Sequence, residues 1–161
     1  MINILFLVGA YFFMEFIAWS NHKYVMHGFL WIWHKDHHTN DHKKVAMHEM
    51  TFSGMEKNDL FFLVYATPAI VLLISGFYFD LPKLTFSGIG ITLYGLTYFW
   101  IHDILIHQRI RIPFLYNIKN SYTEAIIRAH YAHHRPRSRE DFTNYGLLIF
   151  PFRFFRKESQ K

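Results

Sequence analysis

Two long stretches of this chain contain no charged residue, and they constrain its fold more than any other feature. They cover residues 60–79 and 84–101, and a helix needs about 20 apolar residues to cross a bilayer. Only residues 80–83 separate them, and the proline among these four is typical of a turn. We therefore expect two transmembrane helices joined as a hairpin.

A third apolar stretch, residues 2–19, is interrupted only by Glu15. It lacks the basic start and the small-residue cleavage site of a signal peptide, so we expect a span that is retained. A carboxyl group in a span either faces the helical bundle and has a function, or marks a helix end near the membrane interface. The sequence leaves both interpretations of Glu15 open.

Composition favours a membrane protein and excludes several kinds of site. Aromatic residues make up 20% of the 161 residues, and 18 residues are phenylalanine, which favours contact with lipid over a soluble core. The absence of cysteine excludes disulfide frameworks, zinc–thiolate sites, iron–sulfur clusters and thiol nucleophiles. At this length, we expect a single domain that covers residues 1–161.

The basic residues predict which side of the membrane each polar segment faces. Five lysines lie in residues 20–59, eleven lysines or arginines follow residue 101, and the hairpin turn carries Lys83 alone. Because cytoplasmic segments carry an excess of these residues, we expect residues 20–59 and 102–161 to face the cytoplasm from the inner membrane. The predicted fold is an all-α integral-membrane helical bundle with a cytoplasmic histidine-rich cap.

The two polar segments hold all twelve histidines of the chain, and ten of them repeat one pattern. Each set starts with two histidines that four residues separate, and continues with a triplet in which two are adjacent. The ten are His22, His27, His34, His37 and His38, then His102, His107, His130, His133 and His134. A pH sensor or a solvated face also uses histidine, but two matching sets favour shared metal ligation. We expect the remaining His42 and His48 to be structural or at the surface.

The spacing of the histidines has a geometric meaning. Residues three and four apart lie on one face of a helix, so each triplet can point at one place. His22 and His27 are five apart, roughly 140° around an ideal α-helix, and His102 and His107 have the same spacing. The members of each pair therefore approach the metal from different sides, or the helix is distorted there. Because the pairs begin where spans end, we expect the metals just beneath the membrane.

Ten imidazoles are more than one first-row metal ion can bind, which indicates a di-metal site with about five histidines per ion. Neutral imidazole suits iron, copper, zinc and nickel. Zinc has no redox chemistry, so a zinc pair would imply hydrolysis. Soluble di-iron bundles use glutamate ligands, whereas few carboxylates lie near these histidines. The residues alone leave the metal open.

Several segments carry a more specific signature. They are residues 22–28, residues 31–38 with two tryptophans beside the first triplet, residues 102–107, residues 130–134 and the tail 135–146. These segments resemble the bacterial carotenoid β-ring hydroxylases of the membrane fatty acid hydroxylase superfamily. The histidine pattern alone is typical of the superfamily, and the tryptophan-containing cluster narrows the resemblance to carotenoid substrates. The resemblance covers nearly the whole chain.

The resemblance implies a non-haem site of two iron ions, with the ten patterned histidines as its catalytic ligands and dioxygen as the oxidant. The implied reaction converts β-carotene, at ring carbon 3, to β-cryptoxanthin and then zeaxanthin. The implied electrons come from NAD(P)H through ferredoxin reductase and a ferredoxin-type donor. The chain contains no flavin, haem or iron–sulfur motif, so this donor is a separate protein. Seven basic residues either dock the donor or only reflect membrane orientation: Lys43, Lys44, Arg109, Arg111, Arg135, Arg137 and Arg139.

Two further expectations concern the surroundings of the metals. Metal-bound imidazoles usually donate their second N–H to a carboxylate or a carbonyl, and the candidate acceptors are Asp36, Asp103, Glu124 and Asp141. The run of aromatic and basic residues 145–157 either lies in the headgroup layer or packs as a helix on the catalytic part.

Other functions stay open at this point. Within the superfamily they are a fatty-acid or sterol hydroxylase, a desaturase and a carotenoid ketolase. Outside it, the alternative is a membrane metal carrier or sensor, although a carrier needs a polar route across the bilayer and residues 60–79 and 84–101 carry no charge. Nucleic-acid binding by the basic tail is disfavoured because the tail adjoins spans and metal ligands.

Overall fold

The computed structural model describes residues 2–42, 55–110, 112–136, 138 and 141–156. Within these ranges the chain forms helices and irregular segments and no strand, as predicted. The α-helices are α1 (Ile2–Ser20), α2 (Trp31–His42), α3 (Phe61–Tyr78), α4 (Pro82–Tyr98), α5 (Pro113–Tyr116) and α6 (Ser121–His134). Two π-helical segments, η1 (Asn21–Phe29) and η3 (Phe99–Ile106), and two 3₁₀ turns, η2 (Lys57–Leu60) and η4 (Phe152–Phe155), complete the set.

Three helical rods are long and apolar enough to cross a membrane. They are Ile2–Phe29, Lys57–Tyr78 and Pro82–Ile106, because α1 continues into η1 and α4 into η3. Large apolar side chains such as Phe12 and Ile74 remain more than 60% exposed along these rods. Exposed apolar surface of this extent is suited to lipid, so the structure is that of a membrane protein.

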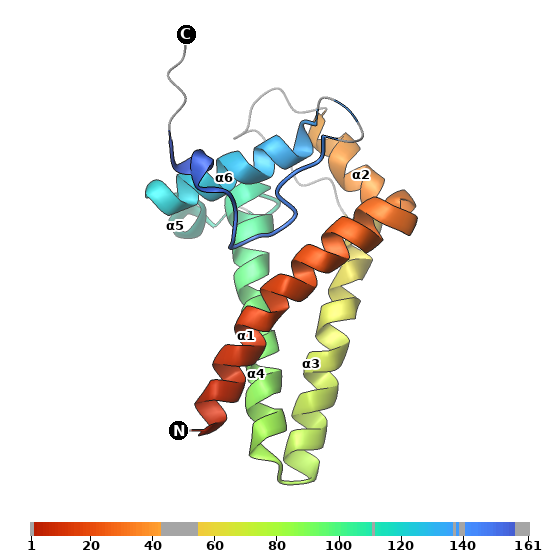
Figure 1. Cartoon of the computed structure of the whole chain (residues 1–161), viewed down its shortest axis with the longest axis vertical. Helices are drawn as coiled ribbons and strands as arrows, with labels where there is room; N and C mark the ends of the chain where they lie inside the picture. Colours follow the sequence, from red (N-terminus) through yellow and green to blue (C-terminus); the bar gives the residue numbers. More distant parts are fainter. Residues whose placement is uncertain (1, 43–54, 111, 137, 139–140, 157–161) are drawn as a thin grey trace.

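The three rods lie side by side, and the remaining helices cover one end of them. Figure 1 shows α3 and α4 as an antiparallel hairpin, with α1 crossing it, while α2, α5 and α6 gather at the end opposite the hairpin turn. Both α1 and α3 pack along α4. The predicted histidine segments therefore form a cap at one end of the bundle.

Glycines on α4 allow this close packing of the rods. A methyl group added at Gly90 would overlap the backbone oxygen of Leu7 on α1, and one added at Gly88 would lie 2.8 Å from the Leu73 side chain on α3. Small residues at such contacts let transmembrane helices approach closely. The packing positions α1 and α3 on either side of the helix that leads into η3.

The C-terminal segment packs on the cap, so the structure favours packing on the catalytic part over a position in the headgroup layer. This holds for residues 145–156, where the described part of the chain ends. Residues 141–151 have no regular secondary structure, whereas this alternative expected a helix, and η4 is the short helical turn that follows. The Leu147 side chain is buried with side chains of η3 and α6, and the Tyr122 hydroxyl donates to the Leu148 oxygen over 2.8 Å. Ile149 and Phe152 stay exposed.

Candidate metal centre

Two π-helical segments bring each histidine pair together. In η3, the backbone N–H of His107 donates to the carbonyl of His102 over 2.9 Å, which is the i→i+5 bond of a π-helix. The two rings lie with their centroids 4.4 Å apart. In η1, the rings of His22 and His27 lie 5.0 Å apart. The helix is thus distorted at both pairs, which is the second of the two alternatives.

The first group of histidines, called the five-histidine group, joins η1, α2 and α6. Each member offers one ring nitrogen, and these nitrogens all lie within 4.8 Å of one another. The Nε2 atom of His34 lies 3.1 Å from those of both His22 and His38, and the Nε2 atoms of His27 and His133 lie 3.0 Å apart. The group consists of His22, His27, His34, His38 and His133.

The second group, called the four-histidine group, joins α2, the residue that follows η3, and α6. Its members are His37, His107, His130 and His134, all buried, with one ring nitrogen each inside the same 4.8 Å limit. The His102 ring lies beside this group, 5.0 Å from the rings of His37 and His130. The structure therefore brings all ten patterned histidines to one end of the rods, in two adjoining groups.

Four of these imidazoles have a defined acceptor at Nδ1. Two acceptors are side chains at the start of the second rod, and two are backbone carbonyls of the C-terminal segment. The pairs are His34 with the Asn58 amide oxygen (2.6 Å), His37 with the Glu56 carboxylate (3.2 Å), His22 with the Tyr145 carbonyl (2.9 Å) and His133 with the Thr143 carbonyl (2.6 Å). Because these oxygens accept, each Nδ1 carries the proton and each Nε2 presents a lone pair.

The contact between His22 and His34 is the strongest indication of a bound cation. Both Nδ1 atoms donate elsewhere, so two Nε2 lone pairs face each other across 3.1 Å. A proton on one of the two Nε2 atoms would turn this contact into a hydrogen bond. Near neutral pH His34 does not carry that proton, because burial lowers its pKa to about 4. Two imidazole nitrogens bound to one metal at right angles, each at about 2.1 Å, are about 3.0 Å apart. The residues fit a metal ion between them.

Burial also lowers the pKa of four further ligand candidates, His37, His130, His133 and His134. Desolvation, with the charges of neighbouring histidines, lowers the pKa of His37, His130 and His134 well below its ordinary value. It lowers the pKa of His133 to about 3, although the Thr143 carbonyl opposes the shift. Neutral imidazole is the form that binds transition metals. Among the described residues, Nε2 of His37 is buried without a hydrogen-bond partner, as a metal ligand would be.

The sequence missed most of the Nδ1 acceptors. Asp103 lies 3.5 Å from Nδ1 of His102, but Asp36 accepts from the backbone N–H groups of His37 and Lys57, and Glu124 pairs with Arg128. Asp141, the fourth candidate, is exposed. The true side-chain acceptors, Glu56 and Asn58, lie at the start of the second rod and directly before the uncharged stretch 60–79. Their position directly before a predicted span could have identified them in the sequence. A backbone carbonyl acceptor has no such signal, because every residue type has one.

The structure describes only some of the remaining predicted residues. His42 ends α2, His48 lies outside the described residues, and so do five of the seven basic residues, Lys43, Lys44, Arg111, Arg137 and Arg139. Arg109 binds Asp59, and the Arg135 guanidinium lies over the Tyr131 ring.

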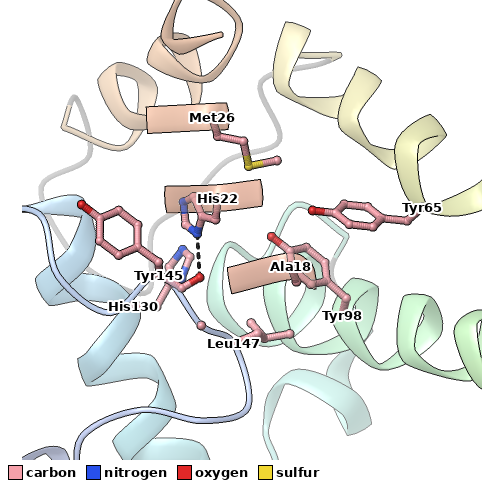
Figure 2. A pocket seen from close by; sticks show the side chains of 9 residues that line it. Ala18, His22, Met26, Tyr65, Tyr98, His130, Tyr145 and Leu147 are labelled. Atoms are coloured by element: carbon pink, nitrogen blue, oxygen red, sulfur yellow. Dashed lines mark hydrogen bonds between the residues drawn. The ribbon is translucent and has the colours of Figure 1, made fainter. Parts of the chain in front are cut away.

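A small cavity lies between the rods and both histidine groups. Figure 2 shows His22 of the first group and His130 of the second at its wall, with Tyr65 of α3 and Tyr98 of α4 facing them. The remaining lining residues are Ala18, Met26, Tyr145, Gly146 and Leu147. Side chains of all three rods and of both histidine groups therefore line this cavity.

Comparison with known proteins agrees with this geometry. The family model described as fatty acid hydroxylase matches residues 7–155. A protein named beta-carotene hydroxylase from a Paracoccus species is 39% identical over 153 residues, which is 94% of this chain and 86% of the relative. Proteins with the same name from Pantoea ananas and Pseudescherichia vulneris are 39% and 38% identical, over 86% and 92% of this chain and 71% and 77% of their own lengths. No solved structure matches. On these matches and its two histidine groups, the chain belongs to the fatty acid hydroxylase family.

Proposed function

We propose that this protein is a membrane-bound oxygenase that hydroxylates the β-ring of a carotenoid. The substrate is β-carotene, and hydroxylation at ring carbon 3 gives β-cryptoxanthin and then zeaxanthin. The observation that carries the proposal is the pair of histidine groups, one buried and one largely buried, at the end of three membrane-capable rods. The bacterial relatives named beta-carotene hydroxylase, which match most of both chains, support the choice of substrate.

The cofactor of this proposal is a pair of non-haem iron ions. The five-histidine group would hold one ion, and the four-histidine group together with His102 would hold the other. When bound, iron supplies the redox chemistry with dioxygen that a zinc pair lacks. The Nδ1 acceptors of the chain hold the rings in the orientation and tautomer that ligation requires.

The other residues of the site would position the ring and exclude water. The cavity beside His22 and His130 is lined by Met26 and by the phenol rings of Tyr65 and Tyr98. The cavity has room for little more than one water molecule, so a ring that arrives from the bilayer would have to displace these side chains. Every member of the four-histidine group is buried, and a dry site limits side reactions of the oxidant.

The electrons would come from a separate protein. The chain has no cysteine and can hold no thiolate-ligated cluster. A ferredoxin-type donor, reduced by NAD(P)H through ferredoxin reductase, would therefore dock on the cap. The orientation proposed for the cap is toward the cytoplasm, from the inner membrane, because both polar segments are rich in lysine and arginine.

Expression in a host that accumulates β-carotene tests the proposal. We expect β-cryptoxanthin and zeaxanthin in the pigment extract, and none from cells that carry the empty vector. Membranes supplied with β-carotene, NAD(P)H, ferredoxin and ferredoxin reductase should form the same products only in the presence of dioxygen. Ketolated products would instead indicate a ketolase, modified fatty acids a lipid hydroxylase or desaturase, and metal uptake without oxygen-dependent turnover a carrier.

A further inference from the structure

Glu15 lies inside the first rod, yet its carboxyl group is fully engaged. Its exposed fraction is 4%, so of the two interpretations of this residue the structure favours the one facing the bundle. The Oε2 atom accepts from the Tyr94 hydroxyl of α4 over 2.7 Å. The Oε1 atom accepts from three successive backbone N–H groups, those of Leu147 (2.9 Å), Leu148 (2.8 Å) and Ile149 (3.0 Å). Four donors converge on one carboxylate, as in an anion-binding turn.

The chain that Glu15 holds is the same chain that supplies two Nδ1 acceptors. The carbonyl of Tyr145 accepts from His22, and the carbonyl of Thr143 accepts from His133. Both histidines belong to the five-histidine group. Tyr145 is only two residues from the first anchored N–H, so the position of its carbonyl depends on the anchor.

Gly146 lies between the anchor and the acceptors and permits their close approach. A methyl group at this position would lie 2.7 Å from the Ile149 carbonyl and 3.0 Å from Oε1 of Glu15. Real side chains do not tolerate the shorter of these distances, so alanine here would push the segment away from the carboxylate. The chain therefore offers a way to disturb the anchor without changing Glu15.

We infer that Glu15 is a positioning residue for the five-histidine metal site, acting through residues 143–149. This inference rests on the proposed metal centre. A carboxylate in a span is costly, and its four hydrogen bonds fix the two carbonyls that orient His22 and His133. His37 of the four-histidine group takes its acceptor from Glu56 on another segment. Loss of the anchor should therefore weaken one metal site and spare the other.

The test measures metal binding and backbone protection in detergent-purified full-length protein. Anaerobic titration with Fe²⁺ gives the affinity of each site, and hydrogen–deuterium exchange reports the amides of residues 147–149. For Glu15→Ala and Gly146→Ala, we expect one equivalent at wild-type affinity and one weakened about 10- to 100-fold, with faster exchange at these amides. Glu15→Gln should be closer to wild type, because its amide oxygen still accepts the three N–H groups.

Tyr11→Phe is the matched control. It removes another polar contact between α1 and α4, the bond from the Tyr11 hydroxyl to Thr97 (3.1 Å), and should keep both equivalents and the slow exchange. If Glu15→Ala fails to fold, Gly146→Ala decides the matter. Wild-type affinity at both sites, or equal loss at both, would overturn the inference. Fewer than two equivalents in the wild type would refute the proposed centre instead.

Discussion

Arg109 binds both carboxylate oxygens of Asp59, with Nη1 2.6 Å from Oδ1 and Nη2 2.7 Å from Oδ2. Its Nη1 also lies 3.1 Å from Asp103. Asp59 belongs to the same turn as Glu56 and Asn58, the acceptors for two histidines of α2. The ion pair thus fixes the start of the second rod against the end of η3, and with it the side chains that orient both histidine groups.

Arg109→Lys should destabilise the protein because lysine cannot form the two parallel bonds to Asp59. Charge-assisted hydrogen bonds that are largely removed from water contribute about 1.5–3 kcal/mol each, so we expect a loss of about 2 kcal/mol. Thermal unfolding in detergent measures this loss. Lys57→Ala changes an exposed side chain of the turn that contains Asp59 and should stay within about 0.5 kcal/mol of wild type. Equal stability of the two variants would contradict the role of the pair.

His134→Ala should abolish hydroxylation and leave membrane insertion intact. His134 is buried in the four-histidine group, whereas the lipid-facing surface of the rods is unchanged by the substitution. Pigment analysis in a β-carotene-accumulating host measures activity, and membrane fractionation measures insertion. His48→Ala, outside the repeated pattern, should remain active. Zeaxanthin formation by the His134 variant would remove this residue from the ligand set.

The sequence predicted the parts of this site that follow from α-helical periodicity and hydropathy. Both triplets lie on α-helices, α2 and α6, and the rods are where uncharged stretches predicted helices. The expectation that each triplet points at one place was wrong, because His37 joins the four-histidine group without His34 and His38, and His133 joins the five-histidine group without His130 and His134. His102 and His107 lie on one side of the helix because an i→i+5 hydrogen bond widens the turn between them. A prediction that assumes α-helical geometry throughout does not include this bond. The carbonyl acceptors at Thr143 and Tyr145 depend on where an irregular segment lies in three dimensions, and any residue type supplies a carbonyl.

Gly90→Ala should destabilise the bundle because the added methyl group would overlap the Leu7 backbone on α1. Overpacking of a close contact typically costs about 1–3 kcal/mol, and thermal unfolding in detergent measures it. Gly9→Ala is the control on α1, since a methyl group there meets nothing within 4 Å. We expect no loss of stability for the control. A Gly90 variant as stable as wild type would show that α1 and α4 can separate slightly without cost.

Asn58→Ala and Glu56→Ala should each weaken a different metal site, although the two residues share one turn. Asn58 accepts from His34 of the five-histidine group, and Glu56 accepts from His37 of the four-histidine group. Removing such an acceptor lets the ring rotate and lowers its basicity, which typically costs 10- to 100-fold in metal affinity.

Mössbauer spectra of iron-loaded protein distinguish the two ions if their ligand sets differ. Here one ion would be held by the five-histidine group, and the other by the four-histidine group together with His102. We expect the Asn58 variant to lose intensity from one component and the Glu56 variant from the other, with Lys57→Ala retaining both. Loss of the same component in both variants would mean that His34 and His37 serve one ion, since each acceptor acts on a single ring. The partition of the ligands between the two groups would then have to be redrawn.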